Sequence, residues 1–141
     1  MTLSREAIAR LVPHQGAMCL LEEVLEWDEN TIACRACSHR DPANPLRSNV
    51  GLSAIVGVEY AAQAVAVHGG LTSNSQKPRV GYLAALRDVV CLTERLDLEP
   101  GDLTVRATKV AAEAGRLLYD FRIEGGGREL LKGRLSVVIS G

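Results

Sequence analysis

One segment, residues 53–70, limits the folds open to this chain more than any other. It is apolar on all sides of a helix, and small residues recur along it: Ala54, Gly57, Ala61, Ala62, Ala64 and Ala66. A helix that is apolar all round is buried, but three polar side chains make this stretch a poor membrane span. We therefore predict a central buried helix with its N-cap at Ser53, running to about His68 and ended by Gly69-Gly70.

Turn-forming residues divide the rest of the chain into a short helix and six strands. The short helix is expected over residues 5–11. The strands are expected over residues 18–27, 31–38, 80–92, 103–110, 116–123 and 129–139. One long apolar helix among strands is typical of α+β packing, and 141 residues suit a single domain covering 1–141.

Charge and cysteine content narrow the function classes. The net charge is −1 and basic residues form no run, which argues against nucleic acid as a partner. The start of the chain lacks the pattern of a secretory signal, and four cysteines then fit a reducing cytoplasm. Cys34 and Cys37 form a C-x-x-C without a second pair, so we expect no metal.

Glu59 is the most informative charge because it lies in the middle of the apolar helix. A buried carboxylate must find a partner, shift its pKa or line a cavity, and such groups are candidates for acid–base catalysis. The alternatives are an exposed stripe of the helix or a structural ion pair with an arginine. Gln63 follows one turn later, so its amide could orient the Glu59 carboxylate.

Several motifs, in order along the chain, resemble the β-hydroxyacyl-[acyl carrier protein] dehydratases. They are the Pro-His opening and apolar strand of residues 13–24, the Glu-x-x-x-Gln helix signature of residues 59–63, the small-apolar strand of residues 81–86, the Pro-Gly-Asp-Leu turn of residues 100–103, and the last strand, residues 133–139. The resemblance implies a hotdog fold, in which an antiparallel sheet wraps a central helix. It also implies a homodimer, or a dimer of dimers, with active sites at the dimer interface.

In that family, a His of one subunit and a Glu of the other dehydrate a 3-hydroxyacyl thioester to a trans-2-enoyl thioester in fatty acid or polyketide-type synthesis. By resemblance, Glu59 assists loss of the C3 hydroxyl as water. The thioester carbonyl is held by amides at the helix start, here those of Ile55, Val56 and Gly57. Tyr82, Leu83 and Gln63 are further substrate-binding candidates. The substrate is bound to acyl carrier protein or coenzyme A, and no cofactor is needed beyond the phosphopantetheine that it carries.

The histidines depart from the family pattern. The usual His-Phe-Pro-Gly loop is missing, and His39 lies 20 positions before Glu59. A divergent branch of the family, found beside bacterial polyene and polyketide-type synthesis genes, resembles this chain more closely, because it shares the helix motif of residues 57–63. His39 and His14 are both candidates for the base that removes the C2 proton, and either one could instead be structural.

Two rival functions remain open. A hotdog acyl thioesterase would use Glu59 to activate water and would need no histidine. A catalytically silent subunit would instead pair with an active dehydratase, and the altered histidine loop favours that alternative.

Overall fold

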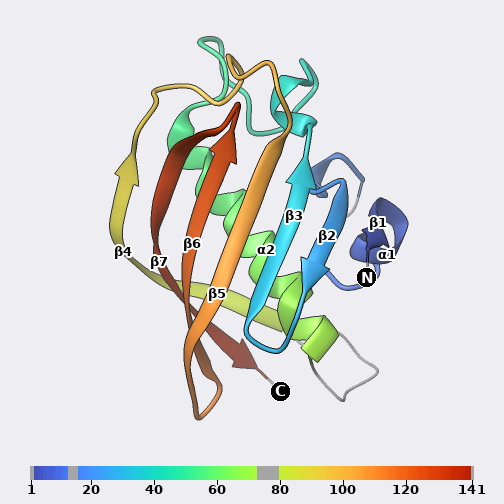
Figure 1. Cartoon of the computed structure of the whole chain (residues 1–141), viewed down its shortest axis with the longest axis vertical. Coiled ribbons are helices and arrows are strands. Elements are labelled where there is room, and N and C mark those ends of the chain that lie inside the picture. Colours follow the sequence, from blue (N-terminus) through green and yellow to red (C-terminus); the bar gives the residue numbers. More distant parts are fainter. Residues whose placement is uncertain (1, 13–15, 73–79, 141) are drawn as a thin grey trace.

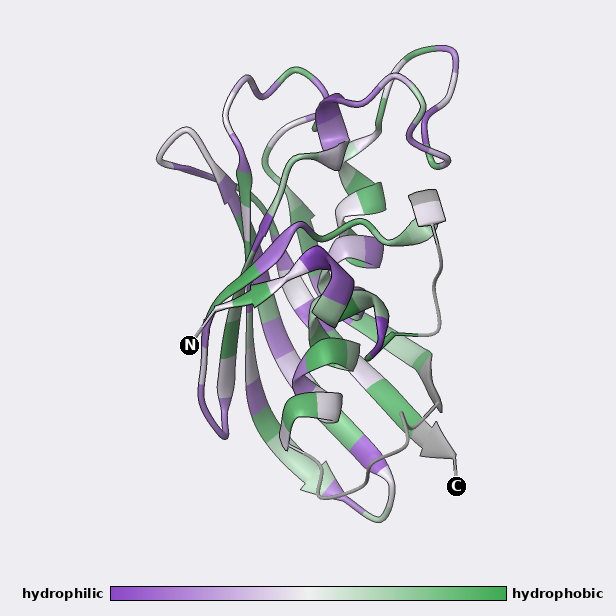
Figure 2. Cartoon of the chain, turned by 90° about the vertical axis from the view of Figure 1, so that its right-hand side faces the viewer, coloured by the Kyte–Doolittle hydropathy of each residue, from purple (hydrophilic) through white to green (hydrophobic). Residues whose placement is uncertain are grey.

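The computed structural model describes residues 2–12, 16–72 and 80–140. A seven-stranded antiparallel sheet curves around the central helix α2 (Gly57–Thr72), as Figures 1 and 2 show. The strands are β1 (Leu3–Ser4), β2 (Glu23–Trp27), β3 (Thr31–Ala36), β4 (Val80–Cys91), β5 (Leu103–Glu113), β6 (Arg116–Gly125) and β7 (Arg128–Ser140). Their order across the sheet is β1-β2-β3-β5-β6-β7-β4. The predicted α+β hotdog architecture is confirmed.

Small residues let α2 lie close to the sheet. A Cβ atom on Gly57 would overlap Leu131 Cδ2 and come within 2.9 Å of Ile123 Cδ1. The helix is preceded by a 3-10 turn, η3 (Ala54–Val56), and Ser53 makes no side-chain cap there. The predicted end at Gly69-Gly70 is wrong, because α2 continues to Thr72. Gly70 allows close packing instead, since a Cβ there would lie 3.1 Å from Leu11 Cδ2.

Other predicted boundaries shift where short turns replace strand. Helix α1 covers Arg5–Ala9, and Ser4 Oγ accepts a hydrogen bond from the Ala7 amide at 3.4 Å. A 3-10 turn, η1 (Gly16–Met18), occupies the start of the predicted strand 18–27, which begins only at Glu23. A second turn, η2 (Ser38–Arg40), takes the end of the predicted strand 31–38.

Strand β4 forms one edge of the sheet and pairs only with β7. From Leu83 to Cys91 its side chains are largely exposed, among them Leu83, Leu86 and Val90 at 41–42%. The pairing with β7 is irregular between Arg87 and Val90, where Asp88 has a φ of 54°. Such an edge leaves backbone groups and apolar side chains available to another chain.

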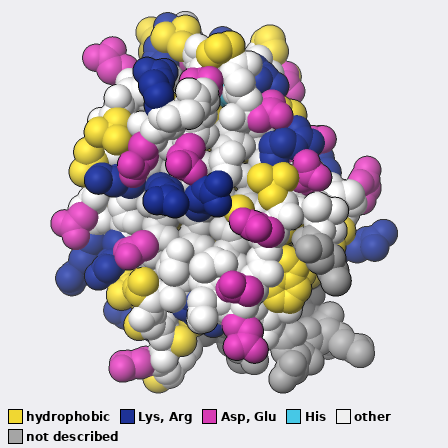
Figure 3. Space-filling view, viewed as in Figure 1, with side chains coloured by type: hydrophobic (Ala, Val, Ile, Leu, Met, Phe, Trp, Pro, Cys, Tyr) yellow, Lys and Arg dark blue, Asp and Glu magenta, His cyan; other side chains and the backbone are white. Residues whose placement is uncertain are grey.

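The outer face of the sheet is polar. Figure 3 shows positive and negative side chains mixed across it. Arg106 pairs with Glu124, and Arg134 with Asp120, each at 2.7 Å. A pocket on this face, lined in part by Arg106 and Asp120, contains none of the candidate site residues. No helix in the described part of the chain is long and apolar enough to cross a membrane.

Candidate active site

Glu59 lies in the first turn of α2, and its side chain is exposed. The prediction that the carboxylate is buried is therefore wrong for the single chain. It forms no ion pair or hydrogen bond with another described residue. The exposed-stripe alternative describes its position in this chain.

The exposed side of α2 is a narrow stripe. Glu59 is followed by the half-buried Ala62 and Ala66, at spacings of three and four residues, and Ile55, at 50% exposure, precedes it in η3. Such spacing keeps residues on one face of a helix. Within the described residues, the sheet and the loops around it cover the other faces of α2, and the Glu59 side chain is left exposed.

Gln63 does not orient Glu59, contrary to the sequence prediction. Its side chain is 1% exposed and points toward the segment that precedes β2. Its Oε1 accepts a hydrogen bond from the Leu20 amide at 2.9 Å, and its Nε2 donates to the Met18 carbonyl. Gln63 therefore fastens this segment to α2.

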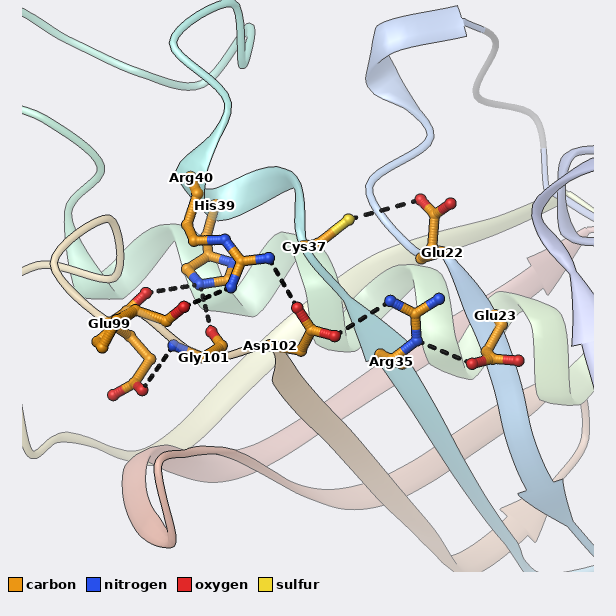
Figure 4. A network of polar contacts seen from close by, with 10 residues as sticks. Glu22, Glu23, Arg35, Cys37, His39, Arg40, Glu99, Gly101 and Asp102 are labelled. Carbon is orange, nitrogen blue, oxygen red and sulfur yellow. Dashed lines mark hydrogen bonds and ion pairs between the residues drawn. The ribbon is translucent and has the colours of Figure 1, made fainter.

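His39 lies in η2 and is fully buried. Its Nε2 is 3.1 Å from the Glu99 carbonyl and 2.9 Å from the Gly101 carbonyl (Figure 4). Carbonyls only accept hydrogen bonds, so Nε2 carries the proton and Nδ1 is the unprotonated nitrogen. Nδ1 is buried and has no partner among the described residues. Burial lowers the pKa of His39, which favours this neutral form.

Charged side chains reinforce the same connection between β3 and the turn at residues 99–102. Arg40 donates to the Pro100 carbonyl at 2.6 Å and to Asp102 at 2.7 Å. Asp102 also accepts from Arg35 at 3.1 Å, as Figure 4 shows. The hydrogen bond from Arg40 is the main reason why the pKa of Asp102 lies below its usual value. The η2 turn is therefore held at several points.

Tyr60 is a buried residue beside Glu59 whose structural role the sequence reasoning missed. Its hydroxyl is 2.8 Å from Ser38 Oγ and accepts from Asn44 Nδ2 at 3.1 Å. Since Ser38 Oγ donates to the Leu20 carbonyl, the Tyr60 hydroxyl donates to Ser38. These bonds fix the loop after β3 to α2 beside Glu59. A buried Tyr next to a candidate Glu was the available signal, because a buried hydroxyl needs a partner.

The helix start offers fewer free amides than the resemblance implies. The Val56 amide donates to the Ser53 carbonyl at 3.0 Å, and the Gly57 amide donates to Ala54. Both are therefore already used within the chain. No hydrogen bond is found for the Ile55 amide within the described residues, so Ile55 is the remaining donor candidate.

His68, which was not a candidate, is fully buried, and its ring bonds the Tyr119 hydroxyl at 2.6 Å and the Asp28 carbonyl at 2.8 Å. The remaining candidates lie elsewhere. Tyr82 lies in β4 opposite Val138, and Leu83 is exposed on the same strand. His14 lies outside the described residues.

The two cysteines of the C-x-x-C pattern differ in burial. Cys34 is fully buried in β3, and Cys37 is half-buried beyond the strand end. In the described ranges no group of three or more potential metal ligands occurs.

Comparison with known proteins identifies one matching family model, ApeP-like (ApeP dehydratase), over residues 6–140. The dehydratase heterocomplex ApeI:P from Xenorhabdus doucetiae matches with a TM-score of 0.83 at 24% identity, covering 95% of this chain and 91% of that one. Thioesterase HI1161 from Haemophilus influenzae matches with a TM-score of 0.68 at 16% identity, covering 100% and 93%. A hypothetical thioesterase from Streptococcus pneumoniae, solved with coenzyme A, gives 0.59 at 12% identity, with 84% of each chain covered. No curated protein matches the sequence.

Proposed function

The chain belongs to the ApeP-like family of dehydratases, and from this membership we propose that Glu59 takes part in its reaction. The chain is a lyase that dehydrates 3-hydroxyacyl thioesters to 2-enoyl thioesters. The observation that carries the proposal for Glu59 is its place on the one exposed stripe of a helix that is otherwise buried. A carboxylate there is open to a substrate and can be enclosed by a second subunit.

The reaction needs two proton transfers. A base removes the C2 proton of the thioester, and the electron pair forms the C2–C3 double bond as the C3–O bond breaks. Glu59, in its protonated form, gives a proton to the departing hydroxyl, which leaves as water. The Ile55 amide is placed near the start of the helix, where a donor would stabilise charge on the thioester oxygen.

The acyl chain is proposed to arrive on an acyl carrier protein, in fatty acid or polyene and polyketide-type synthesis. This carrier follows from the family resemblance, and the phosphopantetheine belongs to the substrate. A comparison of kcat/KM for carrier-bound and coenzyme A-bound forms of one 3-hydroxyacyl group tests it. We also place the protein in the cytoplasm, because its four cysteines are free.

A second hotdog subunit, either another copy or a related dehydratase, is proposed to cover β4 and the exposed stripe of α2. The apolar side chains of the β4 edge support this proposal. Leu86→Lys should weaken assembly in analytical ultracentrifugation. Val110→Lys is the matched control, because Val110 is also exposed, at 45%, but lies in β5 near the hairpin to β6. Equal assembly of the two variants would contradict this interface.

The test of Glu59 uses tagged protein purified from its own cells, so that any bound subunit is retained. Glu59→Gln should lower kcat for 3-hydroxyacyl dehydration by about 10²–10⁴-fold, the usual contribution of an acid–base group. Glu113→Gln changes an exposed carboxylate at the end of β5 and should leave the rate unchanged. A Glu59→Gln enzyme with the wild-type rate refutes the proposal. Hydrolysis of saturated acyl thioesters instead of dehydration would favour the thioesterase alternative.

A further inference from the structure

The first turn of α2, which carries Glu59, begins without a side-chain cap. Ser53, the residue before η3, makes no capping hydrogen bond, and helix ends without such partners tend to fray. Gly57 and Val58 have no side chain that can form a hydrogen bond, and Glu59 is exposed. Tyr60 is therefore the residue of this turn whose side chain can fasten the backbone around Glu59 to the rest of the protein.

The Tyr60 side chain is fully buried, and its hydroxyl is held from two directions. It donates a hydrogen bond to Ser38 Oγ at 2.8 Å and accepts one from Asn44 Nδ2 at 3.1 Å. Burial raises the pKa of Tyr60, so the hydroxyl keeps the proton that it donates to Ser38.

Ser38 and Asn44 are themselves fixed, which makes the loop after β3 a firm anchor. Ser38 Oγ donates to the Leu20 carbonyl at 2.8 Å. Asn44 Nδ2 donates to the Ser38 carbonyl at 2.9 Å, and Asn44 Oδ1 accepts from the Leu46 amide at 2.9 Å. The turn of helix that carries Tyr60 therefore cannot rotate or slide without breaking both bonds of its hydroxyl.

We propose that Tyr60 is a positioning residue, which fixes the backbone of the first turn of α2 and thereby the place of the Glu59 carboxylate. This role rests on the function proposed for Glu59. Tyr60 acts only through its neighbour, because its own side chain is enclosed in the protein. A misplacement of about 1 Å at a reacting group can cost about 10²-fold in rate. We therefore expect Tyr60 to affect kcat more than substrate binding.

Tyr60→Phe tests the proposal, because phenylalanine fills the same space without the hydroxyl. Tagged protein is purified from its own cells, with any bound subunit, and 3-hydroxyacyl dehydration is measured. We expect kcat to fall by about tenfold while KM changes by less than about twofold. The matched control is Tyr119→Phe. Tyr119 is equally buried and loses a hydrogen bond of 2.6 Å to His68, in the later half of α2.

The Tyr119→Phe variant should keep the wild-type kcat, because its hydroxyl lies away from the first turn. An equal loss of kcat in the two tyrosine variants overturns the inference. Thermal melting confirms that each variant is folded.

A double variant separates positioning from a loss of folded protein. In the Glu59→Gln background the acid is absent, so Tyr60→Phe should lower the remaining rate by less than about twofold. A purely structural role would instead reduce the amount of active protein, and the rate would fall by the same factor in both backgrounds. Equal factors in the two backgrounds overturn the inference.

Ser38→Ala removes the same hydrogen bond from the other side and gives a second measurement. It should also lower kcat by about tenfold, and it should add little to Tyr60→Phe, because the two substitutions share one bond. Effects that multiply in this double variant overturn the inference. A wild-type kcat in Tyr60→Phe also overturns it and leaves the proposed function intact, whereas a wild-type kcat in Glu59→Gln overturns the proposed function itself.

Discussion

Gln63→Met offers the sharpest test of how the segment before β2 is held. Methionine keeps the length and much of the volume of glutamine, but it cannot bond the Leu20 amide or the Met18 carbonyl. The Leu20 amide is buried, so its loss of a partner costs about 1–3 kcal/mol. The Met18 carbonyl is only partly buried and costs less. After the gain from a more apolar side chain, we expect the free energy of unfolding to fall by about 2–3 kcal/mol.

Urea unfolding at a fixed protein concentration measures this change, because assembly would shift the apparent stability. For a chain of this size the melting temperature should fall by roughly 8 °C. Hydrogen exchange of the Leu20 amide should also accelerate. Glu59→Gln is the control on the same helix, and at an exposed site without an ion pair it should change stability by less than about 0.5 kcal/mol. An equally small change for Gln63→Met would refute the reasoning.

Three further predictions concern pH, turn geometry and loop anchoring. Burial lowers the pKa of both His39 and His68 below 6.5. As the pH falls, these histidines therefore bind protons in the unfolded chain at a higher pH than in the folded chain. The free energy of unfolding should consequently fall between pH 7 and pH 5, by at most about 1.4 kcal/mol per pH unit for each histidine. His68→Gln should flatten this slope in urea titrations, and an unchanged slope would count against it. Gly126 has a φ of 59°, and a Cβ added there would lie 2.9 Å from Glu99 Oε1, whereas Gly127 has a φ of 74° and open space around it. Gly126→Ala should therefore lose about 2 kcal/mol of unfolding free energy, and Gly127→Ala about 1 kcal/mol. Equal losses in denaturant unfolding would contradict the role of the contact with Glu99. Asp97 accepts hydrogen bonds from the Leu52 amide at 2.9 Å and from Arg95 at 2.6 Å. The Asp97→Asn variant should therefore lose about 1–2 kcal/mol of unfolding free energy. Because the hydrogen bond with Arg95 holds the pKa of Asp97 below 3.8, this loss should persist when unfolding is measured at pH 4.

The sequence predicted the helix and all six long strands because their apolar periodicity is local. It misplaced the end of α2, since Gly69-Gly70 looks like a stop signal. The packing of Leu11 against Gly70 joins positions far apart in the chain, and no local pattern reports it.

The site was harder to predict than the fold because it also depends on contacts between positions far apart in the chain. His39 stands at a strand end where a catalytic base was expected, but its partners Glu99 and Gly101 are about 60 residues away. Glu59 was expected to be buried because its neighbours are apolar. The alignment of Glu59 with Ala62 and Ala66 on one face was visible in the sequence, and it was the signal for an open stripe.

The irregular stretch of β4 around Asp88 affects how copies of this protein can meet. A straight, uninterrupted edge would accept an added strand in many alignments, which is how filaments grow. The left-handed residue and the shifted pairing from Arg87 to Val90 bend the edge and interrupt its row of amides. The pairing also shifts between Leu83 and Ala85, so a neighbour can form a continuous ladder only beside a short part of the strand. The same kink that restricts the choice of alignment also protects the exposed edge from runaway polymerisation.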